Sequence, residues 1–481
     1  MGLNIRLPRT FRSLLVNEDE RNSRWANNDI LPVPYEDRKY TWQAYFGYWF
    51  TVGLNTTVWQ VSLCSGRTCN AGSAIGGILV GSVLSSIVAV LCAEPGILYH
   101  LGFPMLSRST FGMYGSFFVI ILKCFVNFTF FGIQSYWGGQ AIAVMLSAIF
   151  PSFAHMENTL PESAGIETQQ LIGFVIFIVI FTSLMFIHPT KLQPILFFSQ
   201  IMVRPSASLT GLGISTTSAV KEMYGEAIWN PISLLEFLQK NDYSATTRAG
   251  TFFAGTGFFV SQMSVNLVQN SIACGMDLAS LWPKYIDVTR GSLIMCFVGY
   301  LIQPWRFVEQ PGVFISVLSA FGMFISPLAG IGSVDFWIVR QRKWKVPDLY
   351  IGNSKSIYWY TFGWNWRAMA AWCIVIWPSF PGFVASVTSS TDSISVGWIR
   401  AFQVSWIIGF CGGGATYYLI TLVSPPPGGK PYQMELLDEI EGVTITRRMS
   451  SSENVAVTGD ISTDIKHGGT SHTVDIEKHV D

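Results

Sequence analysis

The chain has 481 residues, and half of them are hydrophobic whereas only 12% are charged. Soluble domains carry about 25% charged residues, so this composition excludes an ordinary soluble protein and predicts a polytopic membrane protein. The 30 basic and 30 acidic residues balance, which gives no indication of a nucleic-acid partner.

Residues 1–39 are rich in charge and precede the first apolar run, so they are expected to form an N-terminal tail and not a cleavable signal peptide. Residues 40–423 are expected to form an all-α transmembrane domain of about ten spans, because long uncharged runs alternate with polar loops. Each run is long enough for a span except 291–305, whose helix is expected to extend past Arg290. The uncharged runs are 40–66, 68–93, 124–154, 168–187, 249–276, 291–305, 310–334, 368–391 and 401–429. The third span is expected to begin near Met113, and its Lys123 must then pair or reach the membrane surface.

Charges in the loops predict how the chain is oriented. Basic residues precede the first span and recur in alternate loops, at Arg108, Lys191, Lys284, Arg290 and 340–345. Such loops face the cytoplasm, whereas the loop 151–167 carries three Glu and no Lys or Arg. Both termini are therefore expected in the cytoplasm, with the protein in the plasma membrane. Residues 424–481 are polar and begin with a run of Pro and Gly, which predicts a disordered cytoplasmic tail.

The cysteine and histidine residues give little functional indication. Cys64 and Cys69 flank the outer end of the first span, where an oxidising exterior would allow a disulfide. The other six cysteines lie in apolar segments and behave as small hydrophobic residues. The six His residues show no metal-ligand spacing, so neither a metal site nor a cofactor is predicted.

A polar stripe interrupts the uncharged run 249–276. Gln262, Asn266 and Asn270 recur every four positions and therefore lie on one helix face. A buried amide in hydrocarbon costs free energy unless it has a partner. The stripe thus indicates either a bound ligand or hydrogen bonds across a helix interface.

Several motifs of the chain resemble the fungal branch of the nucleobase:cation symporter family one. They are NDILPVP (28–34), YHLGFP (99–104), SRSTFGMYG (107–115), FGIQ (131–134), GMDL (275–278), WPKYID (282–287), VPDLY (346–350) and NWRA (365–368). The resemblance implies an importer of uracil, allantoin, uridine, thiamine or a related small heterocycle. It also implies a leucine-transporter-like fold, in which two inverted five-helix repeats are followed by two extra helices.

The resemblance implies a substrate site near the middle of the membrane. On the third helix, Phe130 occupies the position of a stacking Trp in relatives, and Gln134 one turn on supplies an amide. On the eighth helix, Asn266 and Asn270 match a double Asn, with Asn270 expected to contact the ligand. Each primary amide offers a donor and an acceptor, which suits the alternating N–H and C=O groups of a pyrimidine or hydantoin edge. Asn55 lies where relatives unwind the first helix, and is expected to contact substrate.

A coupling cation is the second partner that the resemblance implies, besides the heterocycle and the bilayer. Ser261 and Ser264 on the eighth helix match two hydroxyl positions of a sodium site in bacterial relatives. A third such position is Val265 here, and fungal members are thought to use protons, so proton coupling is expected. Thr56 lies in the first-helix segment where relatives unwind, and its hydroxyl is a further candidate cation contact.

The region between the fourth and eighth helices is shorter than the family pattern. Relatives have complete fifth, sixth and seventh helices where this chain has only residues 192–220, which are expected to form one hybrid span. The chain would then have about ten spans where the family has twelve. Arg204 would lie near mid-membrane, at about 2.5–3.5 kcal/mol on insertion scales, and Pro205 would remove a helical donor. A skipped exon or alternative transcript would explain the gap, and an evolved ten-helix transporter is the alternative.

Import of uracil, uridine or allantoin is the main functional hypothesis, and other functions are alternatives to it. Thiamine or nicotinamide riboside is the alternative substrate, although no intramembrane carboxylate is evident for the cation of thiamine. A transport-inactive truncated product, or a membrane sensor or scaffold, would fit the missing helices. An enzyme is not expected, because no paired acid and base is found inside the spans.

Overall fold

The computed structural model describes residues 24–27, 29–33, 38, 41–43, 46, 49, 56, 71–187, 222, 228, 230–308, 311–388, 394–427, 439–440, 443–449 and 453–458. The chain divides into two units, Met1–Met434 and Glu435–Asp481. The expected Cys64–Cys69 disulfide and the hybrid span over 192–220 lie outside the described residues, as does most of the expected first span.

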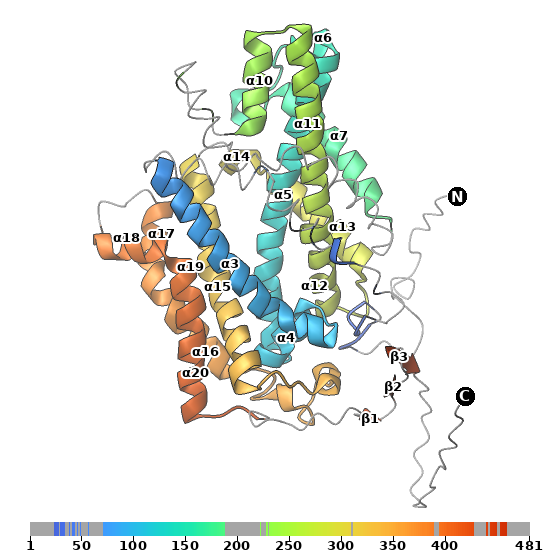
Figure 1. Cartoon of the computed structure of the whole chain (residues 1–481), viewed down its shortest axis with the longest axis vertical. Helices are drawn as coiled ribbons and strands as arrows, with labels where there is room; N and C mark the ends of the chain where they lie inside the picture. The colour runs from blue at the N-terminus through green and yellow to red at the C-terminus, as the bar shows by residue number, and fades with distance from the viewer. Residues whose placement is uncertain are drawn as a thin grey trace, which may run out of the picture. The chain divides into compact units, whose positions relative to one another are not determined.

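The described part of the first unit is built from helices (Figure 1). The helices before the hybrid segment are α3 (Ala71–Tyr99), α4 (Phe103–Phe111), α5 (Gly115–Ile149), α6 (Pro151–Ala154), the 3-10 turn η3 (Glu162–Ala164) and α7 (Thr168–Leu184). Those in the middle of the chain are α10 (Pro231–Asn241), α11 (Ala245–Val265), the π-helical segment η6 (Asn266–Ile272), α12 (Ala273–Leu281), α13 (Val288–Leu301) and α14 (Trp305–Val308).

The last third of the unit alternates long helices with short turns. Its elements are α15 (Pro311–Val334), the π-helical segment η7 (Asp335–Val339), the 3-10 turns η8 (Val346–Tyr350) and η9 (Ile357–Trp359), α16 (Trp366–Ile376), the 3-10 turn η10 (Trp377–Ser379), α17 (Phe380–Val387), α18 (Val396–Gln403), α19 (Ser405–Ile407), the π-helical segment η12 (Ile408–Gly412) and α20 (Gly413–Val423).

Side-chain caps explain where several helices begin. The Asn230 side chain accepts a hydrogen bond from the backbone N–H of Ile232, and Pro231 follows as the first residue of α10. Ser244 caps α11 and Asp287 caps α13 in the same way. These residues satisfy backbone donors that the first helical turn leaves free.

The structure confirms most of the expected spans that it describes. Six helices in the described part are long and apolar enough to cross a membrane. The third expected span is α5, which begins at Gly115, close to the expected Met113. The continuous helix of α11, η6 and α12 is not among the six. This helix also continues to Leu281, past the expected end at residue 276, and so includes Asp277.

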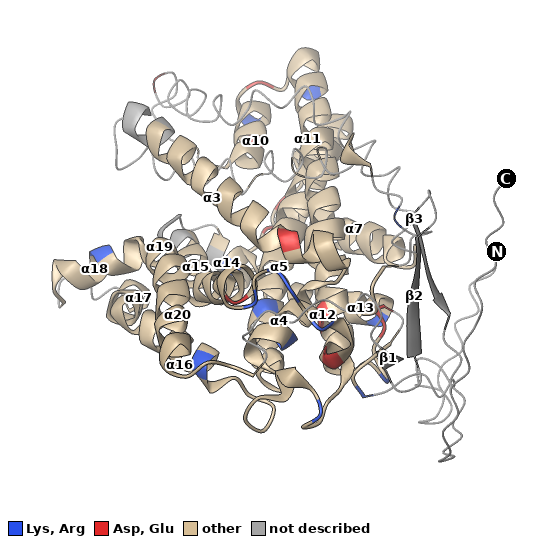
Figure 2. Ribbon diagram, turned by 60° about the horizontal axis from the view of Figure 1, so that its bottom comes forward, with Lys and Arg blue, Asp and Glu red and all other residues tan. Residues whose placement is uncertain are grey.

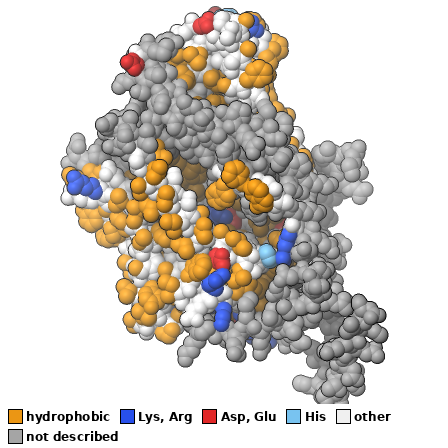
Figure 3. Space-filling model, in the orientation of Figure 1, with side chains coloured by type: hydrophobic (Ala, Val, Ile, Leu, Met, Phe, Trp, Pro, Cys, Tyr) orange, Lys and Arg blue, Asp and Glu red, His pale blue; other side chains and the backbone are white. Residues whose placement is uncertain are grey.

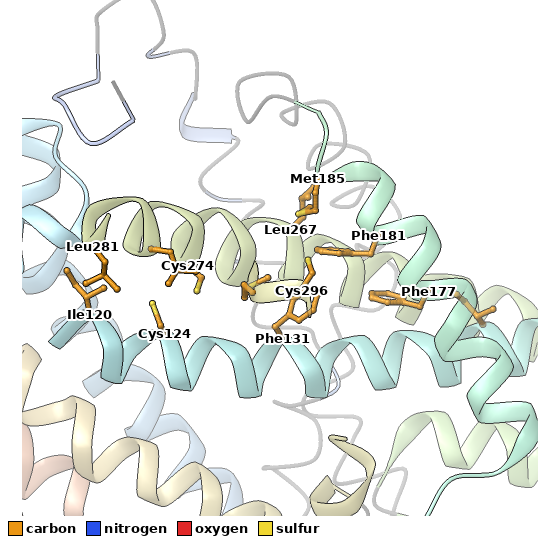
Figure 4. Packing of buried hydrophobic residues seen from close by; sticks show 13 residues of the cluster. Ile120, Cys124, Phe131, Phe177, Phe181, Met185, Leu267, Cys274, Leu281 and Cys296 are labelled. Carbon is orange, nitrogen blue, oxygen red and sulfur yellow. The ribbon is translucent and has the colours of Figure 1, made fainter. Parts of the chain in front are cut away.

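Helix α5 is the centre of the helical unit. It packs against α4, α7, α11, α12 and α13. At its crossing with α7 there is no room for a side chain, because a Cβ added at Gly173 would overlap the carbonyl oxygen of Gly139. Small residues permit such close packing, which holds membrane helices together where the hydrophobic effect cannot. Figure 4 shows the neighbouring apolar cluster, in which Phe131 of α5 lies among side chains of α7 and of the helix that carries Leu267.

Charged side chains are rare along the described helices. Figure 2 shows long stretches of helix without Lys, Arg, Asp or Glu. In Figure 3, hydrophobic side chains cover much of the described surface that this view presents. A surface of this kind suits contact with lipid, and the few charges within the helices therefore require partners.

The second unit holds a three-stranded antiparallel sheet in the order β1 (Glu439–Ile440), β2 (Val443–Met449) and β3 (Glu453–Thr458). Thr444 of β2 pairs with Thr458 of β3, and Met449 pairs with Glu453. The expected disordered tail, residues 424–481, includes these strands, and the extent of its disorder stays a prediction.

Candidate substrate and cation sites

The third-helix candidates lie on one face of α5, near the middle of this 35-residue helix. Gln134 is buried, and Phe130 one turn before it is partly buried. The Phe130 ring lies 5.5 Å from the ring of Phe321 on α15, with 47° between the ring planes. An aromatic surface and an amide are therefore together on a helix that faces the interior of the unit.

The eighth-helix candidates lie in the π-helical segment η6. Asn266 donates to the carbonyl oxygen of Phe131 at 3.3 Å and to the Ser135 hydroxyl at 3.1 Å, both on α5. Asn270 in turn donates to Asn266 Oδ1 at 2.7 Å. Asn266 thus has the interface role that the sequence left open as one alternative. A π-helical turn is often found at functional sites, and here it includes Asn270.

The first residue of the polar stripe contacts a distant part of the chain. Gln262 Nε2 donates to the Thr56 hydroxyl at 2.6 Å, and both side chains are fully buried. Ser261 and Ser264, the other expected cation contacts, are also buried in α11. Within the described residues, Ser264 Oγ has no hydrogen-bond partner. Asn55 lies outside the described residues.

An ion pair with a buried carboxylate joins α5 to α12. Lys123 Nζ lies 2.8 Å from Asp277 Oδ2, and the carboxylate is almost completely buried. The ammonium group also lies over the Phe103 ring, 4.0 Å from its centre. Asp277 lies one residue beyond the uncharged run 249–276, in the helix α12, which continues to Leu281. The requirement that Lys123 find a partner was the sequence signal for this carboxylate.

A second buried cluster ties α4 to the last helices. Asp335 accepts hydrogen bonds from Arg340 Nε at 3.0 Å, the Tyr417 hydroxyl at 2.8 Å and the Thr110 hydroxyl at 3.3 Å. Every partner is buried, and the Asp335 and Arg340 charges neutralise each other. A paired and hydrogen-bonded carboxylate of this kind is structural in character.

Arg108 of α4 connects three distant parts of the chain through their backbone carbonyl groups. Its guanidinium donates to Trp25 at 2.8 Å, to Leu349 at 3.1 Å and to Ser280 at 3.3 Å. Burial lowers the pKa of Arg108 to about 10. The side chain expected in a cytoplasmic loop is therefore a fully buried connection between distant segments and not a free surface charge.

The helical membrane unit holds amides and an aromatic ring in its interior, and an ion pair joins two of its helices. These features are typical of a membrane transporter. The chain belongs to the family of permeases for cytosine/purines, uracil, thiamine and allantoin, whose sequence model matches residues 32–212 and 186–409.

Two fungal relatives match most of the chain. The transporter aclS of Aspergillus oryzae is 28% identical over 540 residues, which cover 84% of this chain and 88% of aclS. The uridine permease of Saccharomyces cerevisiae is 25% identical over 504 residues, covering 87% of this chain and 78% of the permease.

Solved structures of Mhp1, a nucleobase-cation-symport-1 family transporter, show the same fold. Its closed conformation with bromovinylhydantoin bound has a TM-score of 0.57 at 16% identity, and covers 83% of this chain and 97% of Mhp1. Its inward-facing conformation has a TM-score of 0.59 at 17% identity, with 87% and 97% covered. The expected leucine-transporter-like fold is thereby confirmed.

Two features of the alignments relate to the segment that we expect to be missing after residue 203. The aclS alignment is longer than the whole of this chain, so that relative contains residues with no counterpart here. The two family matches overlap at 186–212, within and beside the expected hybrid span. Neither comparison says where along aclS those residues lie, and the missing internal segment stays a prediction.

Proposed function

We propose that this permease imports a nucleobase, nucleoside or related small heterocycle across the plasma membrane, with both termini in the cytoplasm. The observation that carries this proposal is the set of uncharged groups on α5 and η6. Gln134 is buried and Phe130 is partly buried on one face of α5, and Asn270 lies in a π-helical turn. The family's substrates are planar heterocycles, and these side chains suit that chemistry.

The proposed site recognises a planar ring by its face and by its edge. Phe130 and the neighbouring Phe321 present aromatic faces on which a heterocycle can stack. Gln134 and Asn270 each offer a donor and an acceptor for the alternating N–H and C=O groups of the ring edge. Asn266 holds Asn270 through the 2.7 Å hydrogen bond, so we assign it an orienting role in the proposed site.

We propose that the coupling cation is a proton and that Asp277 carries it. A carboxylate can gain and lose a proton, whereas the hydroxyl groups of Ser261, Ser264 and Thr56 cannot do so at ordinary pH. Protonation of Asp277 would cancel its attraction to Lys123, 2.8 Å away, and so loosen α12 from α5. The ion pair thereby offers a direct connection between proton binding and helix packing.

Uptake of labelled uracil, uridine, allantoin and thiamine by a transporter-deficient yeast that expresses the chain tests this function. We expect saturable uptake of one neutral heterocycle, increased by an inward proton gradient and abolished by a protonophore. Gln134→Ala and Asn270→Ala should each abolish uptake at unchanged surface expression, whereas Asn158→Ala, in an exposed loop, should not. Undiminished uptake in both site variants would refute the site assignment.

A further inference from the structure

Two buried thiols meet where α5 packs against α12, and the proposed function gives them no role. Cys124 of α5 is 2% exposed, and Cys274 of α12 is fully buried. The two thiols form a hydrogen bond, and Figure 4 shows their side chains pointing toward one another across the interface. They are therefore a pair of thiols in contact and not two isolated small hydrophobic residues.

The arrangement of this pair suits a disulfide. A disulfide forms only between thiols that face each other, on Cα atoms roughly 5.5–6 Å apart. Thiols that already hydrogen-bond across a helix interface need only a small approach to close that bond. Other described cysteines have different surroundings, since Cys92 Sγ lies 3.5 Å from the Ser333 hydroxyl and Cys373 is exposed.

The thiol pair lies beside the ion pair that joins the same two helices. Cys124 follows Lys123 directly on α5, and Cys274 lies one helical turn before Asp277 on α12. The attraction in the ion pair is lost when Asp277 gains a proton, whereas a disulfide holds the two helices together at any pH. Oxidation of the thiols would thus prevent the proposed loosening of α12 from α5.

A small hydroperoxide, such as hydrogen peroxide, can supply the oxidation. One thiol sulfur attacks the O–O bond and becomes a sulfenic acid, and the first water leaves with the thiol proton. The second thiol then attacks the sulfenic sulfur, the S–S bond forms and the second water leaves. One peroxide is reduced to two waters, and two thiols are oxidised to one disulfide.

Burial restricts which oxidants can reach the pair. Buried thiols react slowly, so the oxidant must be small and uncharged. The interface is not closed on every side, because 24% of the Lys123 side chain next to Cys124 is exposed. The cytoplasm keeps thiols reduced, so the dithiol is the resting form and a rise in peroxide produces the disulfide.

We propose that Cys124 and Cys274 form a redox-sensitive modification site, at which a hydroperoxide links α5 to α12 by a disulfide and thereby arrests transport. The link itself does not depend on the proposed function. Only the arrest of transport rests on that function.

Treatment of the purified full chain with graded hydrogen peroxide tests the link. After free thiols are alkylated, we expect mass spectrometry to find the peptides of Cys124 and Cys274 joined, and dithiothreitol to separate them. The unfolding temperature in detergent should rise on oxidation, because the disulfide closes a loop of about 150 residues. Cys124→Ala and Cys274→Ala should each lose both effects, whereas Cys373→Ala, at an exposed cysteine, should lose neither.

Uptake by yeast tests the consequence. Peroxide should lower uptake several-fold in the unmodified chain and in Cys373→Ala, reversibly with dithiothreitol, and spare Cys124→Ala and Cys274→Ala. The serine variants of both residues repeat the comparison, and unfolding of untreated variants shows whether each one folds.

The outcomes separate the site from its effect and from the proposed function. If no linked peptide forms in the unmodified chain, the site is refuted. A linked peptide with undiminished uptake refutes the arrest of transport. If the untreated chain takes up no heterocycle, the proposed function fails, and the linked peptide still decides the site.

Discussion

Lys123 on α5 and Asp277 on α12 form an ion pair with 2.8 Å between Nζ and Oδ2, although the two residues lie in different halves of the chain. Asp277 is the more deeply buried partner, with 1% of its side chain exposed against 24% for Lys123. The cost of removing one partner should therefore depend on which charge is left behind.

We expect Lys123→Met to destabilise the protein by about 3–5 kcal/mol, because it leaves a buried carboxylate without a counter-ion. Asp277→Asn should cost less, since the remaining ammonium is partly exposed. The double variant Lys123→Met/Asp277→Asn should recover most of the stability. Thermal unfolding in detergent measures all three, and equal losses in the two single variants would contradict this account.

The same pair gives a functional prediction about pH. If Asp277 carries the coupling proton, uptake by Asp277→Asn should lose its dependence on external pH, because the amide cannot be protonated. Uptake measured between pH 5 and pH 7 gives this comparison. A steep pH dependence that persists in this variant would assign the proton to another group.

Asn266 and Asn270 are expected to differ in what their removal does. Asn266→Ala removes two hydrogen bonds to α5, so it should destabilise the fold by about 1–3 kcal/mol. Asn270→Ala removes only the bond to Asn266, so it should unfold close to the unmodified temperature while it loses ligand binding. A larger loss of stability for Asn270→Ala would reverse the two roles.

The hydrogen bond between Gln262 and Thr56 joins two distant parts of the chain and should be detectable as a coupling energy. In a double-mutant cycle of Gln262→Leu, Thr56→Val and the double variant, we expect a coupling of about 1 kcal/mol in the free energy of unfolding. Ser183→Ala with Gln262→Leu serves as the control, because Ser183 bonds only within its own helix. Strict additivity in both cycles would show that the bond contributes nothing.

Arg108→Lys is expected to impair folding severely although the substitution keeps the positive charge. The planar guanidinium contacts carbonyl groups of Trp25, Ser280 and Leu349, and a lysine ammonium is too compact to reach all three. We expect strongly reduced surface expression, measured by fluorescence of a tagged protein in yeast. Arg290→Lys, at a more exposed site, should express normally.

The sequence around Arg204 also makes a prediction about the gene. We expect reverse transcription and sequencing across the codons for Val203 to Pro205 to find transcripts with an additional segment of about two spans. Relatives contain residues that this chain lacks, and a segment of that size would restore the expected twelve helices. Transcripts that join these codons without interruption would instead support a ten-helix transporter.

The sequence alone determined most of the membrane spans that the structure describes, and it restricted the fold. A helix such as Gly115–Ile149 can be recognised because solubility in lipid depends on the composition of one local segment. The family motifs then indicated the arrangement of helices, and the need for a partner to Lys123 followed from the cost of a charge in hydrocarbon. Phe130 and Gln134 could be placed together because the helical period fixes their common face.

Only the tertiary structure decided which residues these side chains meet. Asp277 as the partner of Lys123, Thr56 as the partner of Gln262, and the contact of Asn266 with α5 join segments that are far apart along the chain. The three amides of the polar stripe have the same spacing and the same chemistry, yet their partners differ. Gln262 bonds to Thr56, Asn266 bonds to α5, and Asn270 bonds to Asn266. Local composition decides that a polar group in a membrane needs a partner, whereas the packing of whole helices decides which partner lies within reach.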